Sequence, residues 1–380
     1  MKRLIVSALA AALAVSSLAQ GTLRQATPES HGMNPEKLAQ VDRVINEAIT
    51  AKEIPGAVLS VVRGNDIVYL KAYGSKSVVP TVEPMTTETM FDLASVSKCV
   101  GTTLSFMQLI ENGLVRLTDN VDRYIPGFRP WTDPESGETV SITIRDLLTH
   151  TSGLTPYINA NSFVNEYGGN TPDRLEEFIA TKVKRNFRPG SDFMYSCLNF
   201  ITLQRILERV TGERLYEYAQ RHVFDVLGLR HTCYFPLIYD PAVGDSAGLA
   251  RLCAPTEVQA DGKPLITQVH DPMARRIMGG NSGNAGVFSN AEDLSVVCAA
   301  VMNGGVLVDK KDRPLESTRI LSPLTIRLMT TIPPQNDPSV GRALGWDKKS
   351  SHSGLRGDLF NPETTIMHTG YTGTSIVIDT

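Results

Sequence analysis

The order of hydrophobic and polar positions predicts a helix followed by a β-hairpin near the start of the chain. Residues 35–52 carry apolar side chains at the spacing of a helix face, namely Leu38, Val41, Val44, Ile45, Ala48 and Ile49. Two β-rich segments follow, at residues 57–62 and 67–72. Gly64-Asn65-Asp66 between them is typical of a turn, so the two segments are expected to pair.

Helical patterns dominate the middle of the chain, and strand character returns at its end. Helices are predicted at residues 96–112, 199–211 and 291–302, the first two followed by Gly113 and Gly212, and a strand is predicted at 374–378. This order predicts the α+β class: one antiparallel sheet built from both chain ends, flanked by helices, with a mainly helical insertion. Residues 35–98 and 285–380 are expected to form the sheet-containing domain and residues 99–284 the helical domain, with a ligand cleft between them.

The first 19 residues have the pattern of a secretory signal peptide. Lys2 and Arg3 precede an apolar run at residues 4–18, and Ser17-Leu18-Ala19 is a small-x-small cleavage pattern. A first core helix or a membrane anchor is the alternative, but the run is short for a bilayer span and a polar stretch follows. We expect cleavage after Ala19 and a periplasmic or secreted protein with no integral membrane span.

Composition narrows the classes of function. The chain has 380 residues, 20% of them charged, and a net charge of -3, so nothing favours a nucleic acid partner. The five cysteines include no CxxC pair, and there is no HExxH segment. His231 and Cys233 form an isolated pair that is interpreted as structural. The sequence therefore predicts neither a metal ion nor an organic cofactor.

The segment Ser95-Val96-Ser97-Lys98 lies where a buried helix is predicted to begin. Residues three apart share a helix face, so Ser95 and Lys98 are expected to point the same way. Free N–H groups at a helix start favour developing negative charge near the serine oxygen. Burial is expected to lower the pKa of Lys98, so that it helps to activate the serine. The alternative is that Ser95 is a helix N-cap and Lys98 is exposed.

Two more segments carry candidate groups. Tyr195 follows a Pro-Gly turn and precedes a helix, and a nearby ammonium that lowers its pKa would make it a general base. The alternative is a half-buried structural tyrosine. His368-Thr369-Gly370 lead into the final predicted strand, where the N–H of Tyr371 is expected to pair with that of Ser95 to hold an oxyanion. The alternative there is a plain glycine-rich strand entry.

Taken together, the three segments resemble the motif set of the penicillin-recognising serine enzymes: SxxK, a Tyr-x-Asn-like segment and K/H-T-G, in that order. The tyrosine form is similar to the class C β-lactamase branch, with its D-alanyl-D-alanine carboxypeptidases and esterases. The likeness covers roughly residues 35–379. It includes three flanking segments: Phe91-Asp92-Leu93-Ala94, Leu147-Leu148-Thr149-His150-Thr151-Ser152-Gly153-Leu154, and Gly283-Asn284-Ala285-Gly286-Val287-Phe288-Ser289.

The resemblance implies roles for these residues. Ser95 is the nucleophile, Lys98 its hydrogen-bonded partner and Tyr195 the general base and acid. His368 with Thr369, Gly370 and Tyr371 lines the substrate site. The implied activity is acyl hydrolysis of a small-molecule or peptidoglycan-derived ester or amide, as in the carboxypeptidases and esterases, with a class C-type β-lactamase as the alternative.

Three departures from that family pattern matter. Cys197 stands where Asn or Asp is usual, and a thiol is a poor partner for a substrate amide. His368 replaces the lysine of efficient β-lactamases, and a largely neutral histidine attracts a substrate carboxylate less. The chain stops at Thr380, where relatives continue with a strand and a helix. We therefore expect a fragment with an unpaired strand edge.

Two other interpretations of the function compete with this one. Gly244-Asp245-Ser246-Ala247-Gly248 is a GxSxG match, which in α/β-hydrolases places the serine on a strand-to-helix turn. Asp240-Pro241 and Pro255 interrupt the elements that such a turn needs. A non-catalytic binding or scaffold protein on the same fold is the other alternative, because fold alone does not determine function.

Overall fold

The structure is a computed structural model that describes residues 23–235, 248–351 and 357–379. The predicted signal peptide and Ser246 lie outside these residues. Within the three ranges, no helix has both the length and the hydropathy needed to cross a bilayer.

The N-terminal part contains the predicted helix and hairpin. The helix is split at Ala39 into α1 (Pro35–Leu38), capped by the side chain of Asn34, and α2 (Gln40–Thr50). Strands β2 (Gly56–Arg63) and β3 (Asp66–Ser77) pair antiparallel around a two-residue turn in which Gly64 has a φ of 62°. The predicted hairpin is thus confirmed. β1 (Arg24–Gln25) and β4 (Glu83–Pro84) also pair with β3.

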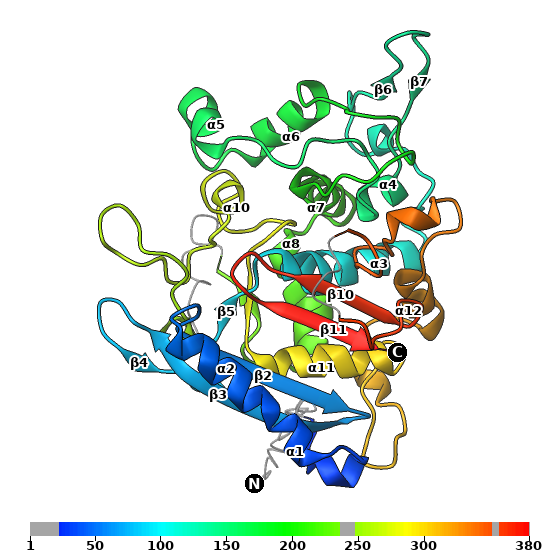
Figure 1. Cartoon of the computed structure of the whole chain (residues 1–380). Helices are drawn as coiled ribbons and strands as arrows, with labels where there is room; N and C mark the ends of the chain where they lie inside the picture. The colour runs from blue at the N-terminus through cyan, green and yellow to red at the C-terminus, as the bar shows by residue number, and fades with distance from the viewer. Residues whose placement is uncertain (1–22, 236–247, 352–356, 380) are drawn as a thin grey trace, which may run out of the picture.

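Helices fill the middle of the chain, as predicted, and α4 to α7 lie in the upper part of Figure 1. They are α3 (Leu104–Glu111), α4 (Ile144–Leu148), α5 (Ala160–Tyr167), α6 (Pro172–Thr181), α7 (Cys197–Thr211), α8 (Leu215–Ala219), α9 (Asp225–Leu227) and α10 (Pro272–Arg276), with the small hairpin β6 (Trp131–Thr132) and β7 (Thr139–Val140). Short 3₁₀ or π turns are η1 (Pro28–His31), η2 (Ala94–Val96), η3 (Lys98–Thr103), η4 (Val121–Arg123), η5 (Gln220–Phe224), η6 (Ala250–Leu252), η7 (Glu316–Thr318) and η8 (Pro338–Val340). α7 ends where predicted, at a left-handed Gly212.

The C-terminal part returns to strands. It contains α11 (Ala291–Met302), with the predicted bounds, α12 (Pro323–Thr330) and the antiparallel pair β10 (Thr365–Thr369) and β11 (Ser375–Asp379). β5 (Phe91–Asp92), β9 (Val287–Ser289) and β8 (Cys233–Tyr234) form a small sheet between the two hairpins in sequence. The α+β class is confirmed.

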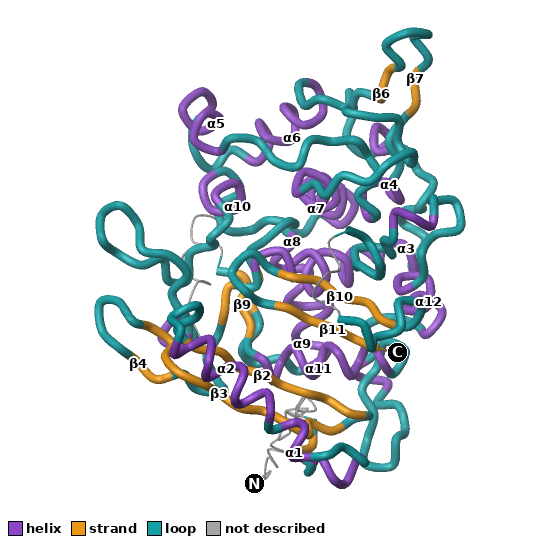
Figure 2. Tube along the Cα trace, viewed as in Figure 1, coloured by secondary structure: helices purple, strands orange, loops and turns teal. Residues whose placement is uncertain are grey.

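The strands from the two chain ends form two separate sheets, one of β1–β4 and one of β10 and β11, instead of one continuous sheet. Among the described residues, β2 pairs only with β3 and β11 only with β10, so each leaves one edge without a strand partner. α11 packs against both β2 and β11 and so lies between the two sheets (Figures 1 and 2). The division into domains at residues 98 and 285 stays a prediction.

The main hydrophobic core surrounds the helical segment that follows Ser95. Val96, Val100, Leu104 and Phe106 are fully buried, and Phe200 of α7 joins the same cluster. Complete burial of such a side chain stabilises the fold by about 1.5–3 kcal/mol. The segment that carries Lys98 is therefore held by packing on all sides, which suits a site whose geometry must be fixed.

A close backbone approach beside this segment gives a stability prediction. Gly345 has a φ of 79°, and a Cβ there would lie 2.0 Å from Thr103 Oγ1. Gly113 has a φ of 69° with nothing within 4 Å of such a Cβ. We expect Gly113→Ala to lower the free energy of unfolding by about 1–2 kcal/mol, the cost of a left-handed alanine. Gly345→Ala should cost about 1–3 kcal/mol more, because the clash adds overpacking. Urea unfolding measures both, and equal losses would contradict the clash.

Candidate active site

The segment around Ser95 is helical but not a regular α-helix. Ser95 lies within the 3₁₀ turn η2, and the π-helical η3 begins at Lys98, where the sequence predicted a regular helix. Thr103 Oγ1 donates to the carbonyl of Lys98 over 2.7 Å, five residues back, which suits the wide turn. The Ser95 side chain caps neither turn, and Lys98 is 0% exposed. The alternative of a capping serine with an exposed lysine is therefore wrong.

The Lys98 ammonium is the centre of the site. Its Nζ donates to Ser95 Oγ over 2.8 Å, to the carbonyl of Asn284 over 2.8 Å, and to Cys197 Sγ over 3.7 Å. It also lies 5.0 Å from the centroid of the Tyr195 ring. Four residues that the sequence analysis singled out thus converge at one point, although 99 positions separate Lys98 from Cys197.

The protonation states differ from those that the sequence suggested. Burial acts to lower the pKa of Lys98, but the adjoining Cys197 and Tyr195 outweigh it, and the pKa lies above its ordinary value. The expected lowering is therefore wrong, because burial was considered without its acidic neighbours. Burial also raises the pKa of Tyr195, against the opposing effects of Lys98 and Ser95. Burial likewise raises the pKa of Cys197. At neutral pH the site holds an ammonium, a phenol and a thiol.

His150 packs against Tyr195, although the sequence identified it only as part of a flanking segment. The two rings lie 4.4 Å apart at an angle of 35°. His150 Nδ1 accepts the N–H of Ser196 over 3.1 Å and lies 3.1 Å from Asn199 Nδ2. A ring nitrogen that accepts a backbone N–H is unprotonated, so the tautomer is fixed. The available signal was its place in the segment at residues 147–154, which is part of the family resemblance.

The segment from His368 to Tyr371 runs beside the same cluster. His368, in β10, is 4% exposed, and its ring lies 6.0 Å from that of Tyr195. Burial lowers the pKa of His368 to about 3, assisted by Arg342 and Lys98, so the imidazole is neutral, as predicted. Its Nδ1 lies 2.8 Å from the carbonyl of Thr369, which fixes Nδ1 as the donor.

Gly370 allows a close approach between this segment and the residues before Ser95. A Cβ at Gly370 would lie 2.4 Å from the carbonyl of Leu93. Thr374 Oγ1 donates to that carbonyl over 2.9 Å. The side chain of Tyr371 is 85% exposed, and its ring stacks on that of His270 at 5.3 Å and 24°. The chain bearing the Tyr371 N–H is thereby held close to the turn bearing the Ser95 N–H.

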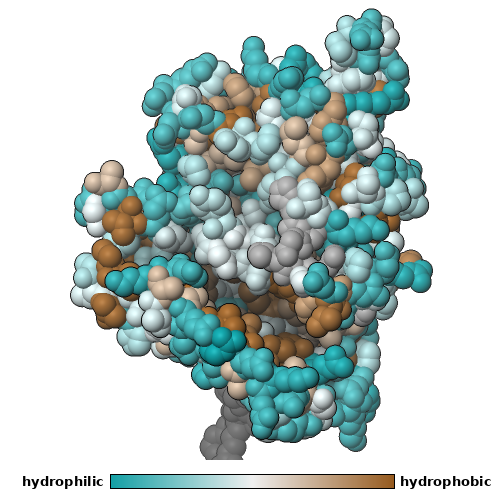
Figure 3. Space-filling view, viewed as in Figure 1, coloured by the Kyte–Doolittle hydropathy of each residue, from teal (hydrophilic) through white to brown (hydrophobic). Residues whose placement is uncertain are grey.

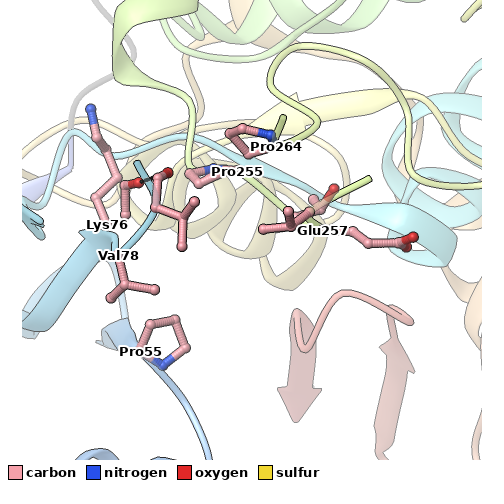
Figure 4. Close-up of a pocket in the computed structure, with 10 residues that line it drawn as sticks. Pro55, Lys76, Val78, Pro255, Glu257 and Pro264 are labelled. Atoms are coloured by element: carbon pink, nitrogen blue, oxygen red, sulfur yellow. Dashed lines mark hydrogen bonds between the residues drawn. The ribbon is translucent and has the colours of Figure 1, made fainter. Parts of the chain in front are cut away.

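A separate surface pocket lies between the end of β3 and residues 255–264 (Figure 4). Pro55, Lys76, Val78, Pro255, Glu257 and Pro264 line it. Three of the valines that line it, Val78, Val79 and Val258, are exposed, and hydrophobic side chains gather at this edge of the molecule in Figure 3. Glu257 connects it to the candidate site, because its Oε2 lies 2.5 Å from Nε2 of His270. The described residues contain no cluster of three or more metal-ligating side chains.

Comparison with known proteins decides the family. The family model described as Beta-lactamase matches residues 41–380. The chain belongs to the β-lactamase family. Members of this family with this fold are serine hydrolases, so the protein is an enzyme of that class.

Curated relatives of the family match nearly the whole chain. A protein of Escherichia coli K12 named "Putative D-alanyl-D-alanine carboxypeptidase" is 32% identical over 397 residues, covering 100% of this chain and 88% of its own length. An N-acetylmuramyl-L-alanine amidase of Bacillus subtilis 168 is 30% identical over 367 residues, covering 92% of this chain and 80% of its own.

Solved structures agree with the family at the level of the fold. The hydrolase EstCE1, described as having promiscuous acyltransferase activity, superposes with a TM-score of 0.66 at 24% identity and covers 90% of both chains. An octameric penicillin-binding protein homologue from Pyrococcus abyssi gives a TM-score of 0.62 at 22% identity, covering 88% of this chain and 68% of its own. The transpeptidase-like arrangement of helices and small sheets is thus shown.

Proposed function

We propose that this member of the β-lactamase family is an exported carboxypeptidase-like hydrolase that cleaves a D-alanyl peptide through an acyl-enzyme on Ser95. The observation that carries the proposal is the 2.8 Å hydrogen bond from Lys98 Nζ to Ser95 Oγ, with the Tyr195 ring 5.0 Å from the same ammonium. A serine hydroxyl needs a neighbouring proton acceptor to become a nucleophile, and this cluster supplies one once it has lost a proton.

The proposed reaction has two steps that share the same groups. Ser95 Oγ attacks the substrate carbonyl while its proton passes to Tyr195 Oη, which acts after the cluster has lost one proton. The N–H groups of Ser95 and Tyr371 hold the oxyanion. As the C–N bond breaks, Tyr195 returns the proton to the leaving amine. Water then attacks the acyl-enzyme by the same route, giving the acid and free Ser95.

The two N–H groups are available for this role. Neither the Ser95 N–H nor the Tyr371 N–H donates to another group among the residues that the structure describes. Two N–H groups without a protein acceptor near a nucleophile suit an oxyanion.

Two observations bear on the substrate. The carboxypeptidase name of the relative that matches the whole chain favours a D-alanyl peptide. Cys197 favours an ester as the second candidate, because it contacts Lys98 and offers a substrate amide only a weak hydrogen-bonding partner. The neutral His368 adds no cation to attract a substrate carboxylate, so it does not separate a β-lactam from a D-alanyl peptide, both of which carry one, and it is compatible with an ester.

A three-substrate panel tests the proposal: a D-Ala-D-Ala peptide, p-nitrophenyl esters and nitrocefin, each with wild type and Ser95→Ala. We expect release of D-alanine by wild type and a fall of at least about 10³-fold in Ser95→Ala, since loss of a nucleophile leaves only binding and oxyanion contributions. Intact-mass measurement should show one adduct with a labelled penicillin or an activated ester, absent in Ser95→Ala.

Each alternative has its own outcome in that panel. Ester turnover without peptide turnover would replace the carboxypeptidase by an esterase, and nitrocefin turnover above both would indicate a β-lactamase. No adduct with either reagent would favour the scaffold. Activity that survives in Ser95→Ala and is lost in Ser246→Ala would transfer the reaction to the GxSxG segment.

The export part of the proposal rests on residues 1–19. Lys2 and Arg3, the apolar run and Ser17-Leu18-Ala19 support a signal peptide cleaved after Ala19 and a periplasmic or secreted enzyme. N-terminal sequencing of the protein expressed with residues 1–19 in a bacterial host should begin at Gln20. An intact Met1 on cytoplasmic protein would contradict export.

A further inference from the structure

Asp92 is a buried carboxylate that the proposed proton transfers do not use. It ends β5, three residues before Ser95, and is 1% exposed. Its Oδ1 accepts the N–H of Ala94 over 2.8 Å, and its Oδ2 accepts the N–H of His270 over 2.6 Å. Burial raises the pKa of Asp92, while these two hydrogen bonds oppose that effect. A carboxylate kept in the interior needs such donors, so the two bonds account for its retention there.

The first bond controls the backbone just before the nucleophile. Ala94 has a φ of 44°, in the left-handed region that a residue with a Cβ enters only at a cost of about 1–2 kcal/mol. Such strain persists only where neighbouring contacts enforce it. The bond from the Ala94 N–H to Asp92 supplies one such contact, and the Ala94 conformation sets the direction of the next N–H, that of Ser95.

The second bond reaches the segment that precedes α10. It fixes the backbone of His270, whose ring stacks on Tyr371 and whose Nε2 lies 2.5 Å from Glu257 Oε2. The backbone carbonyl of Asp92 also accepts the hydroxyl of Thr372 over 2.6 Å. Asp92 therefore contacts Thr372, which follows Tyr371, and His270, whose ring covers one face of the Tyr371 ring.

We infer that Asp92 is a positioning residue that fixes the two N–H groups of Ser95 and Tyr371 relative to each other, and so sets the geometry of the oxyanion hole. This inference rests on the proposed function and deepens it. Donors of an oxyanion hole act only when they lie about 2.7–3.1 Å from the developing charge, and removal of one typically costs 10²–10³-fold in kcat. Two N–H donors that are less well placed should lower kcat by less than the loss of one donor does.

The variant Asp92→Asn tests the inference, with Asp293→Asn as the matched control. The Asn side chain accepts one N–H and cannot accept both in the same geometry. Asp293 is also buried and accepts a backbone N–H, that of His231, over 2.7 Å, but it lies at the start of α11. The readouts are kcat and KM for a p-nitrophenyl ester, and the affinity of a boronic acid, whose tetrahedral adduct on Ser95 places an oxygen in the oxyanion hole.

We expect Asp92→Asn to lower kcat and the boronic acid affinity together by roughly tenfold or more, with KM changed by less than about threefold, because oxyanion contacts act on the transition state. Asp293→Asn should lose thermal stability only. Unchanged kcat and boronic acid affinity in folded Asp92→Asn would overturn the inference. Equal kinetic losses in both variants would do the same, since they would indicate a merely structural effect.

A second variant decides the case if Asp92→Asn does not fold. Thr372→Val removes the hydroxyl that donates to the Asp92 carbonyl and leaves the buried carboxylate intact. A fall of roughly two- to fivefold in kcat and boronic acid affinity is expected, as for one contact that holds an oxyanion donor indirectly. No change in either would overturn the inference. If wild type itself neither turns over ester nor forms an adduct on Ser95, the proposed function fails first, and this inference falls with it.

Discussion

Replacing Lys98 with methionine is expected to lower the acylation rate of Ser95 by about 10³-fold. The ammonium donates to Ser95 Oγ and lies against the Tyr195 ring, so its loss removes both the partner of the nucleophile and the charge that stabilises a Tyr195 phenolate. A positioned acid–base group contributes about 10²–10⁴-fold, and here one residue supports two such groups. Stopped-flow acylation by an activated ester measures the loss.

The same replacement should leave the fold intact. Methionine fills similar space without a buried charge, a change that is often neutral or stabilising. The carbonyl of Asn284 loses its donor, which costs about 1–3 kcal/mol and offsets that gain. We therefore expect the free energy of unfolding in urea to stay within about 2 kcal/mol of wild type. An inactive variant that is also unfolded would not support a catalytic role.

Lys348 provides the matched control for this prediction. It is also buried, although less completely than Lys98, and its Nζ donates to the carbonyls of Thr330 over 3.0 Å and Glu363 over 2.8 Å. Lys348→Met therefore removes a buried ammonium of the same kind without touching Ser95. We expect it to keep acylation within about threefold of wild type, since it removes no group in contact with the reacting atoms. Comparable losses in the two variants would contradict the role given to Lys98.

The parts of the fold that were predicted correctly depend on local chemistry. The β2–β3 hairpin follows from a two-residue turn between β-rich segments, and α11 has the predicted bounds because Asn290 caps its start. The prediction of one continuous sheet was wrong among the described residues. Pairing between strands from the two chain ends is a long-range property that the alternation of side chains along one strand does not encode. β2 and β11 have the strand character expected of them but do not pair with each other among the described residues.

At the candidate site, too, local spacing was predicted correctly and long-range contacts were not. The pairing of Ser95 with Lys98 follows from their spacing on one helical segment. The arrival of Tyr195 and His368 at the same point was supported only by the order of three motifs that resemble a family. Asp92 and His150 were missed as site residues, because their importance comes from bonds to His270 and Ser196, which lie 178 and 46 positions away. No local pattern marks a carboxylate or an imidazole for such a partner.

Replacing Tyr195 with phenylalanine should lower kcat/KM by about 10²–10³-fold and remove a pH dependence that wild type shows. The phenyl ring keeps the stacking on His150 but has no proton to exchange, so the loss reflects acid–base chemistry and not packing. Ester hydrolysis followed from mildly acid to alkaline pH measures both effects. A variant within tenfold of wild type at every pH would exclude Tyr195 as the base.

The direction of the pH dependence follows from the protonation of the cluster. The pKa values of Lys98 and Tyr195 are both raised, so both groups are protonated at neutral pH. One of these protons must leave before Tyr195 can accept the proton of the Ser95 hydroxyl. The competent form gains population as pH rises, and wild-type kcat/KM should therefore increase into the alkaline range. His368, with a pKa of about 3, stays neutral throughout and contributes no acid limb.

Cys197 is the remaining group that could produce such an increase, because burial raises its pKa and its sulfur lies 3.7 Å from Lys98 Nζ. Cys197→Ser separates the two explanations, since serine does not titrate in this range. If the increase comes from the Lys98–Tyr195 pair, it persists in Cys197→Ser and vanishes in Tyr195→Phe. The opposite result would make the thiol the group whose proton must leave before Ser95 reacts, and Tyr195 would then be a packing partner of His150.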